Sequence, residues 1–159
     1  MSFSDSSWQD CIDTGRSTAC YTVTYMGGII DHSTHVPSIV ALSSAEAEYN
    51  AACTACMSTD HHRMLLNELD RVNPDDNPSP ITILLDSKSA IAMGKSFKDT
   101  KHTRHIARRF HYVREGEQQG RFKIQYIDNS LQFSDIGTKN TTIDDLESRM
   151  KFLMVKVPE

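Results

Sequence analysis

Four acidic residues stand close to points where predicted strands and helices begin or end. They are Asp5 in FSDSSW, Glu48 in ALSSAEAEYNAAC, Asp86 at the end of ITILLD and Asp135 in FSDIGTK. Carboxylate oxygens drawn from separate elements can form the oxygen-rich site that Mg²⁺ or Mn²⁺ prefers. Taken singly, each acid is more often a solvated side chain or a helix cap, because carboxylates seldom occupy protein interiors. Periodicity alone does not show whether the four converge.

Two glutamates, Glu46 and Glu48, lie only two places apart in ALSSAEAEYNAAC. Residues two apart on an α-helix point about 200° away from each other, so the pair cannot serve a single site. Ser43 followed by Glu46 is a capping box, in which the glutamate is held toward the helix N-terminus. The cap therefore assigns Glu46 a structural role and leaves Glu48 free for chemistry.

Asp86 ends a strand that the sequence predicts to be buried. ITILLD is a continuous apolar run, which is typical of a strand covered on both faces. Ligand sites in open sheets gather at the carboxyl ends of such strands. Because an aspartate there is costly to desolvate, we expect a cationic group to compensate it.

The first half of the chain predicts three strands and a long helix. A short strand around Phe3 comes first, and alternation in TACYTVTYMGGII predicts a second that ends in a Gly27-Gly28 hairpin turn. VPSIVALS, residues 36–43, is the expected returning strand. The helix that follows has apolar residues at helical spacing and is expected to end at Asn73-Pro74. Its spaced residues are Ala45, Tyr49, Ala52 and Cys56, continued by Leu65, Leu66 and Leu69.

The second half predicts the remaining elements of a layered fold. Expected are a strand at 81–86, helices at 87–95 and 103–119, a strand at 121–127 and a helix at 141–155. This order predicts an α/β fold in which a mixed five-stranded sheet carries helices on both faces.

Size and composition predict a single domain spanning residues 1–159. The chain is 38% hydrophobic and 24% charged, as in ordinary soluble globular proteins. It contains no apolar run long enough to cross a membrane and no visible secretory signal. We therefore expect a reducing compartment, in which the four cysteines are thiols.

A basic segment lies on an otherwise acidic chain. Residues 95–123 hold nine lysines and arginines against three acids, a net charge of +6, whereas the whole chain carries −4 and the remainder therefore −10. Such a segment fits a local contact with a polyanion. A solvated helix face is an equally good interpretation of the charges alone.

Taken together, the motifs resemble the ribonuclease H domain of copia-type retrotransposon polyproteins. The resemblance runs from Phe3 to about Lys139 and rests on six segments in the order of the family. They are FSDSSW (3–8), GRSTACYTVTYMGG (15–28), ALSSAEAEYNAA (41–52), LLDSKSAI (84–91), TRHIARRFHYVRE (103–115) and YIDNSLQFSDIGTK (126–139).

This resemblance implies a ribonuclease H-like fold and an endonuclease that hydrolyses the RNA strand of RNA–DNA hybrids. The implied cofactor is a pair of Mg²⁺ ions, for which Mn²⁺ can substitute. Carried over position by position, it assigns catalysis and metal binding to Asp5, Glu48, Asp86 and Asp135. The family uses the second glutamate of its motif, which agrees with the capping argument.

The same resemblance implies partners and contacts. The expected partners are an RNA–DNA hybrid and the reverse transcriptase domain of the same polyprotein, of which this chain would be one piece, and no membrane is expected. The expected location is cytoplasmic, in a retrotransposon particle, or nuclear. Contacts with the hybrid are expected from Ser6, Ser7, Lys101, Arg104, His105 and Arg108.

Two alternatives stay open at this point. The chain could be a catalytically silent remnant that binds hybrids or is only structural, because the first strand is short. A zinc site could form from Cys53 and Cys56 with histidines among His61, His62, His102 and His105. Buried thiols are the preferred interpretation of the two cysteines, because both lie on or beside the apolar stripe of a helix.

Overall fold

A mixed five-stranded sheet, in the order β3-β2-β1-β4-β5, forms the centre of the molecule. The computed structural model describes residues 1–70, 79–96 and 104–153. β1 pairs antiparallel with β2 and parallel with β4, while β2–β3 is antiparallel and β4–β5 is parallel. This confirms the predicted sheet. The strands are β1 (Ser2–Ser7), β2 (Thr18–Tyr25), β3 (Gly28–His35), β4 (Ile81–Leu85) and β5 (Phe122–Tyr126).

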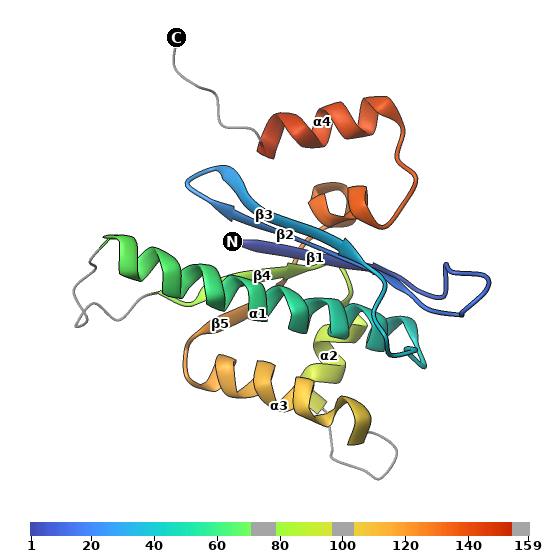
Figure 1. Ribbon diagram of the computed structural model, residues 1–159, viewed down its shortest axis with the longest axis horizontal. Coiled ribbons are helices and arrows are strands. Elements are labelled where there is room, and N and C mark those ends of the chain that lie inside the picture. The colour runs from blue at the N-terminus through green and yellow to red at the C-terminus, as the bar shows by residue number, and fades with distance from the viewer. Residues whose placement is uncertain (71–78, 97–103, 154–159) are drawn as a thin grey trace.

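Helices cover both faces of the sheet, as Figure 1 shows. Three lie on one face: α1 (Ser44–Asp70), α2 (Lys88–Ser96) and α3 (Arg104–Gln118). On the other face lie the 3₁₀ turn η2 (Phe133–Gly137), which follows η1 (Asn129–Leu131), and α4 (Ile143–Leu153). Within the described ranges, none of these helices combines the length and apolar character that a bilayer crossing requires.

The hairpin between β2 and β3 turns one residue earlier than the predicted Gly27-Gly28. Met26 and Gly27 form its turn with φ angles of 49° and 84°, and Gly28 already pairs with Tyr25. Two successive positive φ angles give the strands the twist that a two-residue hairpin needs. The returning strand is therefore residues 28–35, and the prediction of a strand at 36–43 was wrong. The sequence GIIDHSTH was missed because an edge strand with one exposed face need not be apolar.

α1 begins at the predicted cap and packs across the sheet. The Ser43 hydroxyl accepts a hydrogen bond from the Glu46 N–H at 3.1 Å, and the Glu46 carboxylate accepts one from the Leu42 N–H at 3.1 Å. Small buried residues, including Ala51 and Ala55, let the helix approach the strands closely. The predicted end at Asn73-Pro74 lies outside the described residues.

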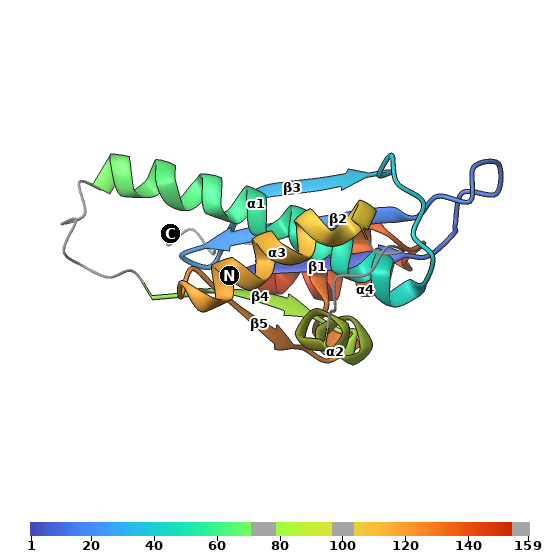
Figure 2. The same cartoon turned by 90° about the horizontal axis from the view of Figure 1, so that it is seen from below.

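The core lies between the sheet and α1, α2 and α3. There the Tyr49 and Phe110 rings stack with their centroids 4.0 Å apart, joining α1 to α3. Figure 2 shows α1 and α3 lying over the sheet, with the C-terminal part of α1 extending beyond the ends of the strands. That extension explains why Leu65 and Leu69, although helical as predicted, are 43% and 78% exposed.

η2 is held tightly against the opposite face. The buried Gln132 side chain donates to the Ser4 carbonyl at 2.8 Å, and the Phe3 and Phe133 rings meet edge to face. A Cβ atom on Gly137 would lie only 2.4 Å from the Cys20 sulfur, so only glycine allows this approach. The contact fixes the segment that carries Asp135.

The α1 cap predicts a measurable stability difference. Ser43→Ala removes the side-chain acceptor and should lower the free energy of unfolding by about 1 kcal/mol. Ser44→Ala, at the exposed neighbouring position, should change it little. Urea denaturation should show a lower midpoint with an unchanged slope for Ser43→Ala. Equal midpoints for the two variants would contradict the capping role.

Candidate active site

Three of the four predicted acids converge at one end of the sheet. Asp5 lies on β1, Asp86 directly follows β4, and Glu48 lies in the second turn of α1. One oxygen of each lies within 4.8 Å of the other two. Their roles in metal binding and catalysis stay predictions, but the geometry can hold a hard cation.

Strand register brings two of these acids together. In the parallel β1–β4 pair, Ser2 lies opposite Ile83 and Phe3 opposite Leu84. Continuing this register by two residues places Asp5 beside Asp86. The indole N–H of Trp8 donates to the Ala41 carbonyl at 3.3 Å, which ties the exit of β1 to the segment that enters α1 and its Glu48.

Glu48 is the most perturbed carboxylate of the cluster. Burial raises its pKa to about 9, and the charges of Asp5 and Asp86 add to the rise. The main-chain amide of Ser6 and the ammonium of Lys139 act in the opposite direction but do not cancel it. Within the described part of the chain, its Oε2 atom is buried without a hydrogen-bond partner.

Asp5 and Asp86 are perturbed for the same reason. Burial raises the pKa of Asp5 to about 6, although a hydrogen bond from the Thr138 hydroxyl and the charge of Lys139 oppose the rise. Burial also raises the pKa of Asp86, with Lys139 again opposing it and Asp135 adding to it. The three acids therefore favour any cation that enters among them.

Asp135 lies beside this cluster and, within the described residues, differs from the other three acids in having a cation close to each of its two oxygens. It is only 3% exposed, and both of its oxygens face cations. Lys139 Nζ lies 2.6 Å from Oδ1, and Arg149 Nη2 lies 3.4 Å from Oδ2. Asp135 is thus close enough to raise the pKa of Asp5 and Asp86, yet it is paired within the protein.

Sequence reasoning missed the residues that compensate the acids. Thr138 and Lys139 belong to the FSDIGTK segment, in which the sequence prediction concerned only Asp135. Arg149 comes from α4, where it also donates to the Gln132 carbonyl, and no sequence signal linked it to Asp135. The spacing of Asp135 and Lys139 by four residues was the one available hint.

An open polar hollow of about 490 Å³ adjoins the cluster. Glu48 and Asp86 form one side of it, and the start of α2 forms another. Lys88 lies over the Tyr126 ring, 4.6 Å from its centroid, and brings a positive charge to this hollow. The other residues that line it are Ser44, Ser87 and Ser89.

The structure describes the side chains of only some residues that were predicted to contact nucleic acid. Ser6 and Ser7 follow Asp5 on β1, and each hydroxyl donates to the Thr18 carbonyl, at 3.1 and 3.5 Å. Arg108 is exposed on α3. Lys101 lies outside the described residues, as do the side chains of Arg104 and His105.

The zinc alternative finds no support in the described residues. Cys53 and Cys56 are buried in the core, and burial raises the pKa of the Cys53 thiol to about 11. The His62 ring is hydrogen-bonded to the Ser58 carbonyl, and His102 lies outside the described residues. The preferred interpretation of buried thiols is confirmed.

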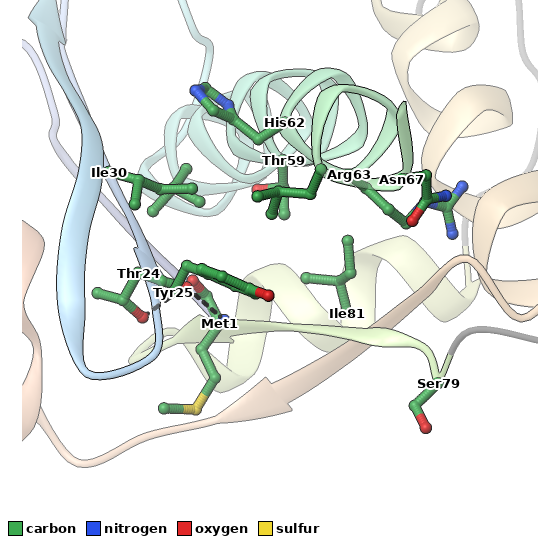
Figure 3. A pocket seen from close by; sticks show the side chains of 12 residues that line it. Met1, Thr24, Tyr25, Ile30, Thr59, His62, Arg63, Asn67, Ser79 and Ile81 are labelled. Carbon is green, nitrogen blue, oxygen red and sulfur yellow. Dashed lines mark hydrogen bonds between the residues drawn. The ribbon is translucent and has the colours of Figure 1, made fainter. Parts of the chain in front are cut away.

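A second, mostly apolar hollow of about 280 Å³ lies at the opposite end of the sheet (Figure 3). Figure 3 shows Tyr25 and Ile81 beneath the C-terminal half of α1, from which His62 and Arg63 project. Its lining includes Met1 at the start of β1, whereas the carboxylates lie where β1 and β4 end. The two hollows are therefore separate.

Comparison with known proteins agrees with this architecture. RNase H1 from the halophilic archaeon Halobacterium salinarum superposes with a TM-score of 0.57 at 17% identity, covering 91% of this chain and 96% of that one. The N-terminal RNase H domain of a Mycobacterium tuberculosis protein gives 0.58 at 12% identity, covering 94% of each chain. The fold is that of ribonuclease H. LC11-RNase H1, solved in complex with an RNA/DNA hybrid, gives 0.55 at 12% identity, covering 82% of this chain and 86% of that one.

The predicted likeness to retrotransposon polyproteins is also confirmed. The chain is 29% identical over 137 residues to the retrovirus-related Pol polyprotein from transposon TNT 1-94 of Nicotiana tabacum. The match covers 86% of this chain and about a tenth of that polyprotein. No family model matches the chain.

The raised pKa values predict how stability depends on pH. With a chelator present, the folded state binds more protons than the unfolded chain between the ordinary glutamate pKa of 4.5 and the folded value of about 9 for Glu48. Stability should therefore fall as the pH rises through this interval, and the titration of Asp5 should add to the fall up to about pH 6.

Glu48→Gln should flatten this decline, because the neutral amide has no charge to desolvate. Glu147→Gln, an exposed substitution on α4, should keep the wild-type profile. Urea denaturation at several pH values measures the stability profile of each variant. Parallel profiles for Glu48→Gln and the wild type would rule out Glu48 as the source.

Proposed function

We propose that this domain is a metal-dependent ribonuclease H that hydrolyses the RNA strand of RNA–DNA hybrids. The observation that carries the proposal is the convergence of Asp5, Glu48 and Asp86 at the strand ends of a ribonuclease H fold. Similarity to a Pol polyprotein supports the substrate class and a link to a reverse transcriptase domain in the same polyprotein. The hybrid-bound LC11-RNase H1 supports the same substrate.

The residues present fit a divalent cation. Three carboxylates offer anionic oxygens, and the buried Oε2 of Glu48 has no partner within the described chain. Hard ions such as Mg²⁺ or Mn²⁺ bind such oxygens, and their charge would offset the burial and the repulsion that together raise the pKa of Glu48. When bound, a pair of such ions supplies a more acidic attacking water and stabilisation of the leaving 3′ oxygen.

Each acid has a distinct task in this proposal. Asp86, at the end of β4 and level with Asp5, would hold both ions together with Asp5. Glu48 would hold one ion and contact the ribose. Asp135 would hold the other ion more loosely, which is consistent with its pairing to Lys139 in the structure.

The surfaces around the cluster suit a nucleic acid. Ser6 and Ser7 already donate their hydroxyl protons to Thr18, so each presents lone pairs that can accept from a ribose 2′-OH. Lys88 in the polar hollow and Arg108 on α3 offer charges for phosphates. These contacts would fix the hybrid without reading its sequence.

A silent hybrid-binding domain is the second candidate. The observation that favours it is the engagement of both Asp135 oxygens by Lys139 and Arg149. A silent domain would bind the hybrid without cleaving it and would bind Mg²⁺ weakly. Titration calorimetry with Mg²⁺ separates the two candidates.

The proposed activity predicts metal-dependent cleavage. A labelled RNA–DNA hybrid should be cut in its RNA strand when Mg²⁺ is present and remain intact in EDTA. Glu48→Gln and Asp86→Asn should each lower the rate by orders of magnitude, because each removes an anionic ligand while keeping side-chain size. Both variants should remain folded by circular dichroism.

Glu46→Gln is the matched control for Glu48→Gln. It lies on the same helix two places away, and its carboxylate accepts from the Leu42 N–H instead of facing the cluster. This variant should keep near-wild-type cleavage. Loss of cleavage in Glu46→Gln with retention in Glu48→Gln would overturn the assignment of the two glutamates.

The exposed arginine of α3 predicts a salt effect on binding. Arg108→Gln should weaken binding of a non-cleavable hybrid and reduce the log–log salt slope by about 1, because one phosphate contact is lost. Lys151→Gln, on α4 at the other face of the sheet, should leave the slope unchanged. Identical slopes for both variants would show that Arg108 is only solvated.

A further inference from the structure

The Lys139 ammonium joins the fourth acid to the other three. Its Nζ atom lies 2.6 Å from Asp135 Oδ1 and 3.8 Å from Asp5 Oδ2. The Thr138 hydroxyl, one residue earlier, donates to the same oxygen of Asp5. The two residues that follow η2 therefore place one hydrogen-bond donor and one cation beside the acids of the site.

Lys139 acts electrostatically on the whole cluster. Its charge lowers the pKa of Asp5, Glu48 and Asp86, against the burial that raises each of them. Conversely, although burial lowers the pKa of Lys139 itself, its hydrogen bond to Asp135 and the attraction of the neighbouring acids raise it overall. The neighbouring acids thus stabilise the positive charge of Lys139.

The two cations that hold Asp135 differ in how firmly they are fixed. The Lys139 side chain is 44% exposed, at the end of a flexible aliphatic stem. The Arg149 side chain is 15% exposed and also donates to the Gln132 carbonyl. Because its side chain is partly exposed, the Lys139 ammonium can reach water by rotation of its stem, whereas Arg149 is anchored by two acceptors.

A divalent ion among these carboxylates would compete with Lys139 directly. It would repel the ammonium and compete with Nζ for Asp135 Oδ1. We propose that Lys139 is an internal counter-ion that holds Asp135 before metal binding and is displaced when a divalent ion enters, which releases Asp135 as the fourth ligand. The inference rests on the metal-dependent function proposed above, and it explains why three acids converge here while the fourth is paired.

Calorimetric titration with Mg²⁺ tests this competition without measuring activity. Lys139→Met keeps the stem but removes the charge, so Mg²⁺ should bind about 10-fold more tightly once the competing cation is gone. In a chelator, the same variant should be less stable than the wild type, because the acids lose their counter-ion. Lys151→Met, an exposed lysine of α4, should change neither quantity. Unchanged or weaker Mg²⁺ binding by Lys139→Met would overturn the proposal.

The wild-type protein offers a second readout that does not depend on the variant folding. Amine-reactive labelling followed by mass spectrometry measures the accessibility of each lysine. Addition of Mg²⁺ should speed labelling of Lys139, whose ammonium is released into water, and leave Lys151 unchanged. Slower or constant labelling of Lys139 at saturating Mg²⁺ would contradict displacement.

The two proposals fail in different ways. Mg²⁺-dependent labelling of Lys139 in a protein that leaves hybrids uncut would support the counter-ion role and overturn the proposed nuclease. Mg²⁺-dependent cleavage by a protein whose Lys139 labelling does not respond to Mg²⁺ would support the nuclease and overturn displacement.

Discussion

The clustering of three carboxylates at one end of the sheet is the constraint on which the surrounding structure depends. One oxygen of each lies within 4.8 Å of the other two, and two of the acids, Asp5 and Glu48, are buried. The result is a raised pKa for each acid, most of all for Glu48. Such a cluster is tolerated only where donors and cations are brought to it, and the elements around it supply them.

The face of the sheet opposite α1 supplies most of this compensation. Gln132 donates to the Ser4 carbonyl, and the close approach of Gly137 to Cys20 presses η2 against β2. Those contacts place Thr138 and Lys139 beside Asp5. α4 adds Arg149 from further along the chain. The segment formed by η2, Thr138 and Lys139 therefore both packs on this face of the sheet and supplies charge and a hydrogen-bond donor to the site.

Local patterns in the sequence predicted most of the fold, because the features behind them are local. The Ser43 cap, the apolar run before Asp86 and the alternation in β5 each act within a few residues. β3 was misplaced because an edge strand needs no apolar face, so its polar sequence gave no signal. The glycine-glycine pair located the hairpin to within one residue, but only the φ angles of Met26 and Gly27 place the turn.

The site was less predictable, because its partners come from distant segments. The pairing of Arg149 with Asp135 joins α4 to η2, and the contact of Thr138 with Asp5 spans nearly the whole chain. No periodicity encodes such contacts. The resemblance to a known family named the four acids, but it did not indicate that one of them would be paired with two cations.

The contrast between Glu46 and Glu48 shows that stability alone does not account for the cluster. Both glutamates lie on the first turns of α1, and they are 5% and 9% exposed. Glu46 accepts from a main-chain amide, so its burial is matched by a helix cap. Glu48 keeps a buried oxygen without a partner in the described chain, beside two further acids. An apolar side chain at position 48 would avoid the free-energy cost of burying a carboxylate. In the proposed function, a cation bound from solution would offset the desolvation of this carboxylate.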